Sequence, residues 1–182
     1  VTGTASGKTL SFLLPILERL ERDPDATQLL LYPTKALAQD QLQAVRRIVE
    51  RHPELRDRVK AGVYDGDTSR SGRRRVRDEA NLILSNPDML HRGLLPYHGA
   101  WHRVFSRLSH VVVDEVHSYR GIFGSNVANV MRRLQRVAAH HGSDPRFLAS
   151  SATIANPREH AEALLDVPVQ AVTTDGAPRG PK

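Results

Sequence analysis

The chain has 182 residues, of which 40% are hydrophobic and 25% are charged, a composition typical of one soluble globular domain. It has no cysteine, which excludes disulfide bonds and thiolate metal sites. No apolar run is long enough to span a membrane and no signal peptide opens the chain, so we expect a cytoplasmic protein without membrane contact. The net charge of +6 favours polyanionic partners, although arginine usage that follows genomic base composition gives the same charge.

Apolar runs alternate with amphipathic stretches from one end of the chain to the other. The apolar runs predict strands at residues 28–32, 59–64, 82–85, 110–114, 147–150 and 169–172. The amphipathic stretches predict helices at residues 8–21, 35–51, 69–79, 126–140 and 157–165. Strands and helices that alternate over short connections predict an α/β fold, with a mostly parallel sheet covered by helices on both faces.

The two ends of the chain carry separate signals. Residues 1–172 are predicted to form one domain, and the Gly- and Pro-containing tail at residues 173–182 is predicted to be a linker or disordered. A phosphate-binding loop normally follows a buried strand, whereas here only Val1 precedes such a loop. We therefore expect a domain truncated before its first strand, from a longer parent protein.

The phosphate-binding loop is the segment TGTASGKT at residues 2–9. In such a loop the backbone N–H groups and a lysine hold the phosphates, and a final hydroxyl reaches Mg²⁺. Thr2 stands where the consensus has glycine. The start of the helix at Lys8 adds the positive end of its dipole. The predicted nucleotide-binding residues are Thr4, Ala5, Ser6, Gly7, Lys8 and Thr9.

An acidic pair, Asp114 and Glu115, directly follows the apolar run Val111-Val112-Val113. Parallel sheets bind ligands at the carboxyl ends of their strands. Asp114 is predicted to hold Mg²⁺ together with Thr9, and Glu115 to position the water that attacks ATP. The simpler interpretation is a strand that ends in two solvated acids. The pairing with the loop at residues 2–9 favours an ATPase, with Glu115, Asp114 and Lys8 as catalytic residues.

Five segments occur in the order found in one family. The loop at residues 2–9 resembles motif I of superfamily 2 DEAD/DEAH-box helicases, and PTKALAQDQ, SNPDML, DEVH and SAT resemble motifs Ia, Ib, II and III. The runs SYRGIFGSNVANV and IANP resemble those of the YprA/MrfA-like DEVH-box DNA helicases, which move 3′ to 5′ and are linked to DNA repair. This resemblance spans nearly the whole chain and implies the N-terminal RecA-like domain of a P-loop NTPase. The family's second RecA-like domain and its zinc-binding C-terminal region have no counterpart among these residues.

The resemblance also implies residues that couple nucleotide and nucleic acid. His117 of motif II is expected to bond to Ser151 or Thr153 of motif III, so that the phosphate state controls domain movement. A satisfied structural histidine and hydroxyls that only cap a turn are the alternatives.

Nucleic-acid contacts are expected where strands end and helices begin. Thr34 and Lys35 offer a hydroxyl and a helix N-terminus to a phosphate, although Thr34 is also an ordinary N-cap. The arginine-rich run at residues 69–77 suits phosphates or a solvated helix face. The predicted contacts are Thr34, Lys35, Asp67, Pro87, Asp88, Arg73 and Arg74.

The sequence thus predicts the ATP-binding domain of an ATP-dependent DNA helicase that uses ATP and Mg²⁺. Its partners would be single-stranded DNA and the second RecA-like domain of the parent chain. Alone it would be weakly active or inactive, because the second domain normally supplies an arginine finger. An RNA helicase, a double-strand DNA translocase, a nucleotide-dependent binding module and an inert fragment are the alternatives.

Overall fold

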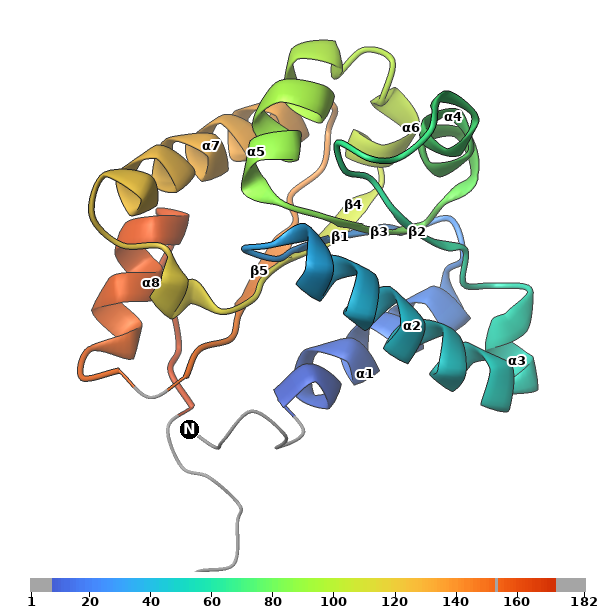
Figure 1. Ribbon diagram of the computed structural model, residues 1–182, viewed down its shortest axis with the longest axis horizontal. Helices are drawn as coiled ribbons and strands as arrows, with labels where there is room; N and C mark the ends of the chain where they lie inside the picture. The colour runs from blue at the N-terminus through green and yellow to red at the C-terminus, as the bar shows by residue number, and fades with distance from the viewer. Residues whose placement is uncertain (1–7, 153, 173–182) are drawn as a thin grey trace, which may run out of the picture.

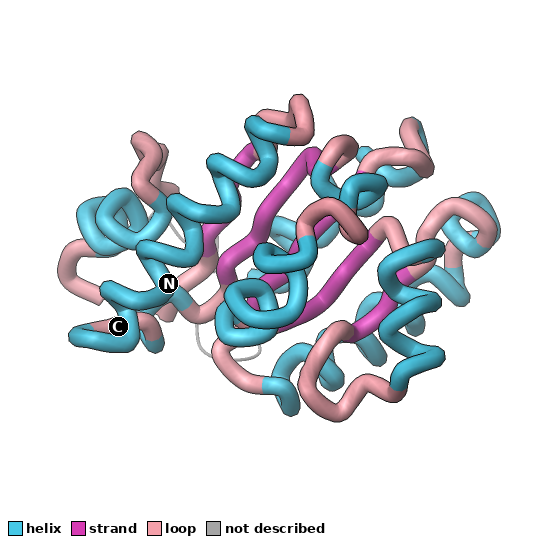
Figure 2. Tube along the Cα trace, turned by 90° about the horizontal axis from the view of Figure 1, so that it is seen from above, coloured by secondary structure: helices cyan, strands magenta, loops and turns pink. Residues whose placement is uncertain are grey.

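The computed structural model describes residues 8–152 and 154–172, and its centre is a parallel sheet (Figure 1). In this part of the chain five strands pair in the order β2-β3-β1-β4-β5, and every pair is parallel. The strands run alongside one another between helices (Figure 2). Their bounds are Thr27–Leu31 (β1), Ala61–Val63 (β2), Leu82–Ser85 (β3), Leu108–Val113 (β4) and Arg146–Ala149 (β5).

The central strands are apolar on both faces, as their sequences predicted. Leu29 and Leu31 of β1 belong to one hydrophobic cluster, whereas Leu30 between them belongs to the other. Val111, Val113 and Val112 of β4 divide in the same way. Successive side chains of a strand point to opposite faces, so a continuous apolar run is what a sheet covered on both sides requires.

Two layers of helices cover the sheet (Figure 1). The first layer packs on the cluster that contains Leu30 and consists of α1 (Lys8–Arg22), α2 (Lys35–Arg51) and α3 (Pro53–Arg56). The second layer packs on the cluster that contains Leu29. It consists of α4 (Arg70–Glu79), α5 (Pro87–Met89), α6 (His102–Phe105), α7 (Gly121–His140) and α8 (Pro157–Leu165). Short π and 3-10 turns occur at Leu90–Leu94, Leu95–Tyr97 and Val116–Ser118. The predicted α/β class is therefore confirmed. None of the described helices is both long and apolar enough to cross a membrane.

The predicted helices agree closely with the structure, apart from one boundary. The bounds of α2 and α8 are as predicted, and those of α1 and α4 differ by one residue. Helix α7 begins at Gly121 rather than at Asn126. Its first turns contain Gly121 and Gly124, and glycine is a poor helix former. The short helices α3, α5 and α6 were not predicted, because three or four residues are too few to display a helical period.

The predicted strand at residues 169–172 is wrong. The mostly apolar run Val-Gln-Ala-Val suggested a strand, but the described residues offer it no strand partner. The N–H of Val169 instead donates to Glu162 Oε1 at 3.1 Å. Val169 packs against the core cluster, while Val172 is 85% exposed. This segment therefore ends the described chain as irregular backbone beside α8, and residues 173–182 lie outside the described residues.

Candidate nucleotide and nucleic-acid site

The predicted motifs gather at one edge of the sheet. Motifs Ia, Ib, II and III directly follow β1, β3, β4 and β5. Because these strands are all parallel, their carboxyl ends share one edge, which is where sheets of this kind bind ligands. The structure therefore brings together four segments that are far apart in the sequence.

Asp114 is a buried carboxylate at this edge, with 6% of its surface exposed. Its N–H donates to Leu31 O of β1 at 2.9 Å. Its Oδ1 accepts the N–H of Glu115 at 2.9 Å and a short hydrogen bond from the Ser150 hydroxyl. Both bonds use Oδ1, so Oδ2 takes part in neither. The carboxylate is thus fixed by β1 and β5, and one oxygen remains for an ion.

Glu115 has an unusual backbone, with φ 52° and ψ 45°. A residue other than glycine in this left-handed region costs about 1–2 kcal/mol, and such strain is concentrated at functional sites. The conformation brings Glu115 Oε2 to 3.0 Å from His117 Nδ1. The two acids of motif II therefore have different surroundings: Asp114 is buried and bonded to hydroxyl and amide, and Glu115 is half-buried beside an imidazole.

His117 connects motif II to motif III through a backbone N–H. Its Nδ1 lies 3.2 Å from the N–H of Ala152. The expected bond to Ser151 is not formed: among the described residues Ser151 Oγ has no hydrogen-bond partner. A backbone N–H is a donor at this position whatever side chain follows, so Nδ1 has a partner here that is not a hydroxyl. Thr153 lies outside the described residues.

The contacts of His117 Nδ1 with Ala152 and Glu115 need opposite states of one nitrogen. A bare Nδ1 accepts the N–H of Ala152, whereas a protonated Nδ1 donates to the Glu115 carboxylate. Only one of these hydrogen bonds exists at a time. The proton on His117 therefore decides whether motif II is bonded to motif III or to its own glutamate.

Ser150 is a functional candidate that sequence reasoning missed. It precedes the Ser151-Ala152-Thr153 motif and was assigned to the strand, yet its hydroxyl contacts Asp114. Its backbone also bridges the two segments, with Ser150 N to Val113 O at 3.1 Å and Val116 N to Ser150 O at 2.9 Å. The pairing of Val113 with Ala149 sets this neighbourhood. Ser150 could be found only from the register of β4 and β5, which a single sequence does not reveal.

Two buried phenols lie near the acidic pair. Burial raises the pKa of Tyr32, and the charge of Asp114 raises it further. Burial, then Asp114 and Glu115, likewise raise the pKa of Tyr119. The Tyr119 hydroxyl is buried and has no hydrogen-bond partner within the described part of the chain. Both phenols therefore stay neutral at physiological pH.

The predicted phosphate-binding loop is described only at its end. Residues 1–7, which include Thr4, Ala5, Ser6 and Gly7, lie outside the described residues. Lys8 opens α1, and Thr9 follows as a half-buried residue of its first turn. A helix that begins at this lysine is the local structure that such a loop requires. The roles of these residues remain predictions.

Motif Ia begins α2, and Thr34 is its N-cap. Thr34 Oγ1 accepts the N–H of Leu37 at 3.2 Å, so the capping interpretation is confirmed, while the hydroxyl proton is left to donate elsewhere. Lys35 Nζ lies 3.0 Å from Asp67 Oδ2. Two residues predicted to contact nucleic acid are thus brought together from separate segments.

The turn that carries Asp67 is held by a buried carboxylate, Asp65, which is only 2% exposed. Asp65 Oδ1 accepts the N–H groups of Asp67 and Thr68, each at 2.9 Å, and Oδ2 accepts from Gln39 at 3.2 Å. Burial raises the pKa of Asp65, but the hydrogen bonds from Thr68, Gln39 and the backbone lower it by more, so the pKa lies below its ordinary value.

The two predicted arginines have different roles in the structure. Arg73 donates to Thr68 O at 2.9 Å and to Gly66 O at 3.0 Å, and its guanidinium lies over the Tyr64 ring. Its side chain therefore supports the turn. Arg74 has only a 3.5 Å ion pair with Asp78, and its side chain is 80% exposed. Arg74 remains available to a phosphate.

Motif Ib forms the short helix α5. Asn86 caps it by accepting the N–H of Met89 at 2.9 Å, and Pro87 occupies the first turn. Asp88 is exposed and pairs with Arg92 at 3.1 Å. An asparagine side chain reaches the N–H three residues ahead, which proline cannot do.

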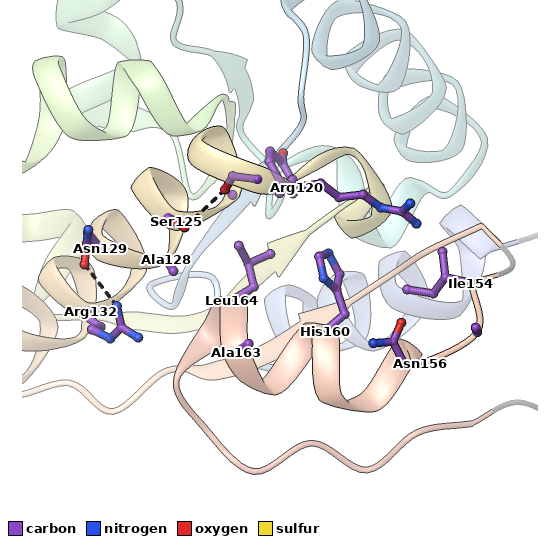
Figure 3. A pocket seen from close by; sticks show the side chains of 14 residues that line it. Arg120, Ser125, Ala128, Asn129, Arg132, Ile154, Asn156, His160, Ala163 and Leu164 are labelled. Atoms are coloured by element: carbon purple, nitrogen blue, oxygen red, sulfur yellow. Dashed lines mark hydrogen bonds between the residues drawn. The ribbon is translucent and has the colours of Figure 1, made fainter.

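Two clefts flank the first turns of α7. One, of about 660 Å³, lies between α7, α8 and residues 154–156; Figure 3 shows His160 and Leu164 of α8 facing it. The other, of about 540 Å³, lies between α5 and α7. Sequence reasoning missed the second cleft, because its arginines become neighbours only when the helices pack. Its charged and aromatic lining is Asp88, His91, Arg92, Phe123, Arg133 and Arg136.

Comparison with known proteins agrees with this arrangement. The model of the DEAD/DEAH box helicase family matches residues 1–161. The chain belongs to this family. Its fold is the RecA-like fold: the structure of the DUF1998 helicase MrfA bound to DNA and AMPPNP superposes with a TM-score of 0.93 at 48% identity, covering 99% of this chain and 25% of that one.

Curated relatives extend well beyond the matched region. The ATP-dependent helicase YprA of Bacillus subtilis is 48% identical over 100% of this chain and 24% of its own length. The ATP-dependent helicase HRQ1 of Saccharomyces cerevisiae is 42% identical over 100% of this chain and 17% of its own length. The predicted resemblance to the YprA/MrfA helicases is confirmed, and this helicase-family chain spans about a quarter or less of such relatives.

The Asp65 turn yields a prediction for stability. Asp65→Asn should lower the free energy of unfolding at pH 7 by about 1–3 kcal/mol, because a buried charged acceptor of several hydrogen bonds is lost. The folded pKa lies below the unfolded value of about 3.9, so this contribution is present at neutral pH and disappears as the pH falls through the folded pKa. Urea unfolding of both proteins across that range would show the difference shrinking in acid.

The matched control is Asp67→Asn, which removes a carboxylate from the same turn. Asp67 is exposed and its ion pair with Lys35 is solvated, so the change should cost no more than about 1 kcal/mol. Equal losses for the two variants would contradict the role given to the buried carboxylate.

Proposed function

We propose that this chain is the ATP-binding domain of an ATP-dependent DNA helicase, in which ATP hydrolysis drives unwinding or translocation. The observation that carries the proposal is the buried Asp114 at the carboxyl edge of the sheet, bonded to Ser150 directly before motif III and followed by the strained Glu115. The relatives named as ATP-dependent helicases, and the MrfA complex with DNA and AMPPNP, support it. Because those proteins are about four times longer or more, the complete activity belongs to the parent protein.

The donor set suits ATP with Mg²⁺. Oδ2 of Asp114, which takes no part in the bonds to Glu115 and Ser150, and the hydroxyl of Thr9 are oxygen donors, which Mg²⁺ prefers over nitrogen or sulfur. When bound, the ion neutralises charge on the β- and γ-phosphates. Lys8 and the N–H groups of residues 4–7 would bind the phosphates, and Glu115 would orient water and accept its proton. The neutral Tyr119 hydroxyl could also donate a hydrogen bond at the same edge of the sheet.

The nucleotide site is tested by fluorescent Mg·ATP binding to the chain. We expect saturable binding that is lost in Lys8→Ala and kept in Glu115→Gln, because glutamine retains the shape of the side chain but is not a base. In the parent protein Glu115→Gln should lower kcat for ATP hydrolysis by about 100-fold or more. Glu79→Gln, an exposed change on α4, is the control.

The outcomes separate the alternative functions. Nucleic-acid binding that is kept in Glu115→Gln, in a parent protein that does not unwind, would indicate a nucleotide-dependent binding module without a hydrolytic role for this residue. Absence of nucleotide binding by a folded chain would indicate an inert fragment.

We further propose that single-stranded DNA crosses the carboxyl edge and the cleft between α5 and α7. The predicted contacts at Thr34, Lys35 and Arg74 are exposed or half-buried there. The cleft adds Arg133 and Arg136, which suit phosphates; Phe123, 50% exposed, is an aromatic face on which a base can stack. Asp67 and Pro87 would shape the path, and Arg73 would hold the turn.

A charge-matched pair of double variants tests this path. Arg133→Ala with Arg136→Ala should weaken single-stranded DNA binding by about tenfold at low salt and reduce the salt slope by about two, because two phosphate contacts are lost. Arg46→Ala with Arg47→Ala changes the net charge equally on α2 and should have a much smaller effect. Equal weakening would show that overall charge alone drives binding. Parallel titrations with RNA and duplex DNA would identify an RNA helicase or a double-strand translocase.

His117 is proposed to couple the two activities, because its Nδ1 faces Glu115 and Ala152 at once. His117→Asn in the parent protein should leave ATP hydrolysis within a few-fold of normal and abolish unwinding. Ser151 and Thr153 would act in the same step. Parallel loss of hydrolysis and unwinding, measured on one DNA substrate, would assign His117 to catalysis instead of coupling.

The resemblance to the YprA/MrfA helicases supports a cytoplasmic role in DNA repair. Cells that lack the parent protein should then be more sensitive to DNA-damaging agents, and unchanged survival would count against that role.

A further inference from the structure

Four histidines from two distant segments meet at the end of α7. This histidine cluster consists of His98 and His102, on either side of the loop that precedes α6, and of His140 and His141, which end and cap α7. His98 Nδ1 lies 2.9 Å from His141 Nε2, and His102 Nδ1 lies 3.0 Å from His141 Nδ1. His140 and His141 are adjacent in the sequence at the end of α7, and the fold brings His98 and His102 to them.

The spacing of the imidazoles suits one metal ion. One ring nitrogen from each of His98, His140 and His141 lies within 4.8 Å of the other two. A tetrahedral Zn²⁺ site has Zn–N distances of about 2.0–2.1 Å, which place its ligand nitrogens about 3.3 Å apart. Small side-chain rotations would therefore close the three rings around an ion, without movement of the backbone.

The surroundings also favour a cation held by neutral ligands. The C-terminal end of a helix carries partial negative charge, and His140 and His141 lie at that end of α7. Among the described residues no carboxylate pairs with any of the four imidazoles. Neutral imidazole is the form that binds metals.

The cluster lies away from the proposed nucleotide site. Helix α6 leads into the start of β4, and His141 precedes the start of β5. Because these strands are parallel, the cluster is at their amino ends, whereas Asp114 is at the opposite edge. A metal bound here would join the loop before α6 to the end of α7 and would not take part in ATP chemistry.

We propose that His98, His140 and His141 form a binding site for a divalent transition-metal ion of the Zn²⁺ type. His141 would bind the ion through Nε2. Its Nδ1–H would donate a hydrogen bond to His102 Nδ1, which would fix the orientation of the His141 ring. Three nitrogen ligands leave a fourth position for water. Nitrogen ligands discriminate against Mg²⁺, which prefers oxygen, so the site is chemically distinct from the one at Asp114.

Zn²⁺ titration of the chain against a chromophoric chelator tests the proposal. We expect one equivalent to bind, with affinity reduced by more than about tenfold in both His98→Ala and His140→Ala, since even residues that only support a ligand change metal affinity by about 10–100-fold. His52→Ala removes an exposed histidine that pairs with Glu54 and should bind like the unaltered chain. Excess Mg²⁺ should not displace the Zn²⁺.

Thermal unfolding provides a second measurement on the same proteins. Zn²⁺ should raise the melting temperature of the unaltered chain and of His52→Ala, but not of His98→Ala or His140→Ala, because an ion that binds only the folded state stabilises it. Folded variants that bind Zn²⁺ as tightly as the control would overturn the proposal. So would a folded chain without saturable binding, which would show that the histidines only hydrogen-bond to one another.

Discussion

The site depends on one constraint, the parallel pairing of β4 with β1 on one side and β5 on the other. This pairing extends past the ends of the strands: Asp114 N bonds to Leu31 O, and Ser150 N bonds to Val113 O. The carboxylate of Asp114 is therefore positioned by the same ladder that forms the core. A change in register would move Ser150 away from Asp114 and turn the alternating valines of β4 to the wrong faces.

Beyond the strand, backbone geometry determines the path of the chain. Glu115 and Gly121 both have positive φ values, and a Cβ on Gly124 would lie 2.5 Å from Tyr119 O. These requirements fold the segment between β4 and α7 tightly enough to bury Tyr119. They also bring Glu115 back toward His117. The acid, the imidazole and the buried phenol between β4 and α7 are thus arranged mainly by local backbone conformation, and the segment after β5 supplies the Ser150 hydroxyl and the N–H of Ala152.

The two edges of the sheet have different chemistry for the same topological reason. Loops at the carboxyl edge present carboxylates, hydroxyls and arginines, which suit phosphates and a hard cation. Loops at the amino edge present the histidine cluster, whose nitrogens suit a softer cation. Parallel strands send every loop after a strand to one edge and every loop before a strand to the other. Two unrelated sites can therefore occur in one small domain without sharing residues.

The sequence by itself determined the elements whose signals are local. Apolar runs and helical periods located all five described strands and the bounds of α2 and α8, and the acids after Val113 indicated the carboxyl edge. The tertiary structure decided whatever depends on contacts between distant segments: the bond from Ser150 to Asp114, the pairing of Lys35 with Asp67, the structural use of Arg73, the arginine cleft and the histidine cluster. It also rejected the strand predicted at residues 169–172. The apolar residues that suggested this strand are neighbours in the sequence, but a strand also needs a partner from a distant segment, and the described residues offer none. Periodicity is a property of a few neighbouring residues, whereas register and packing are fixed only when the whole sheet has formed.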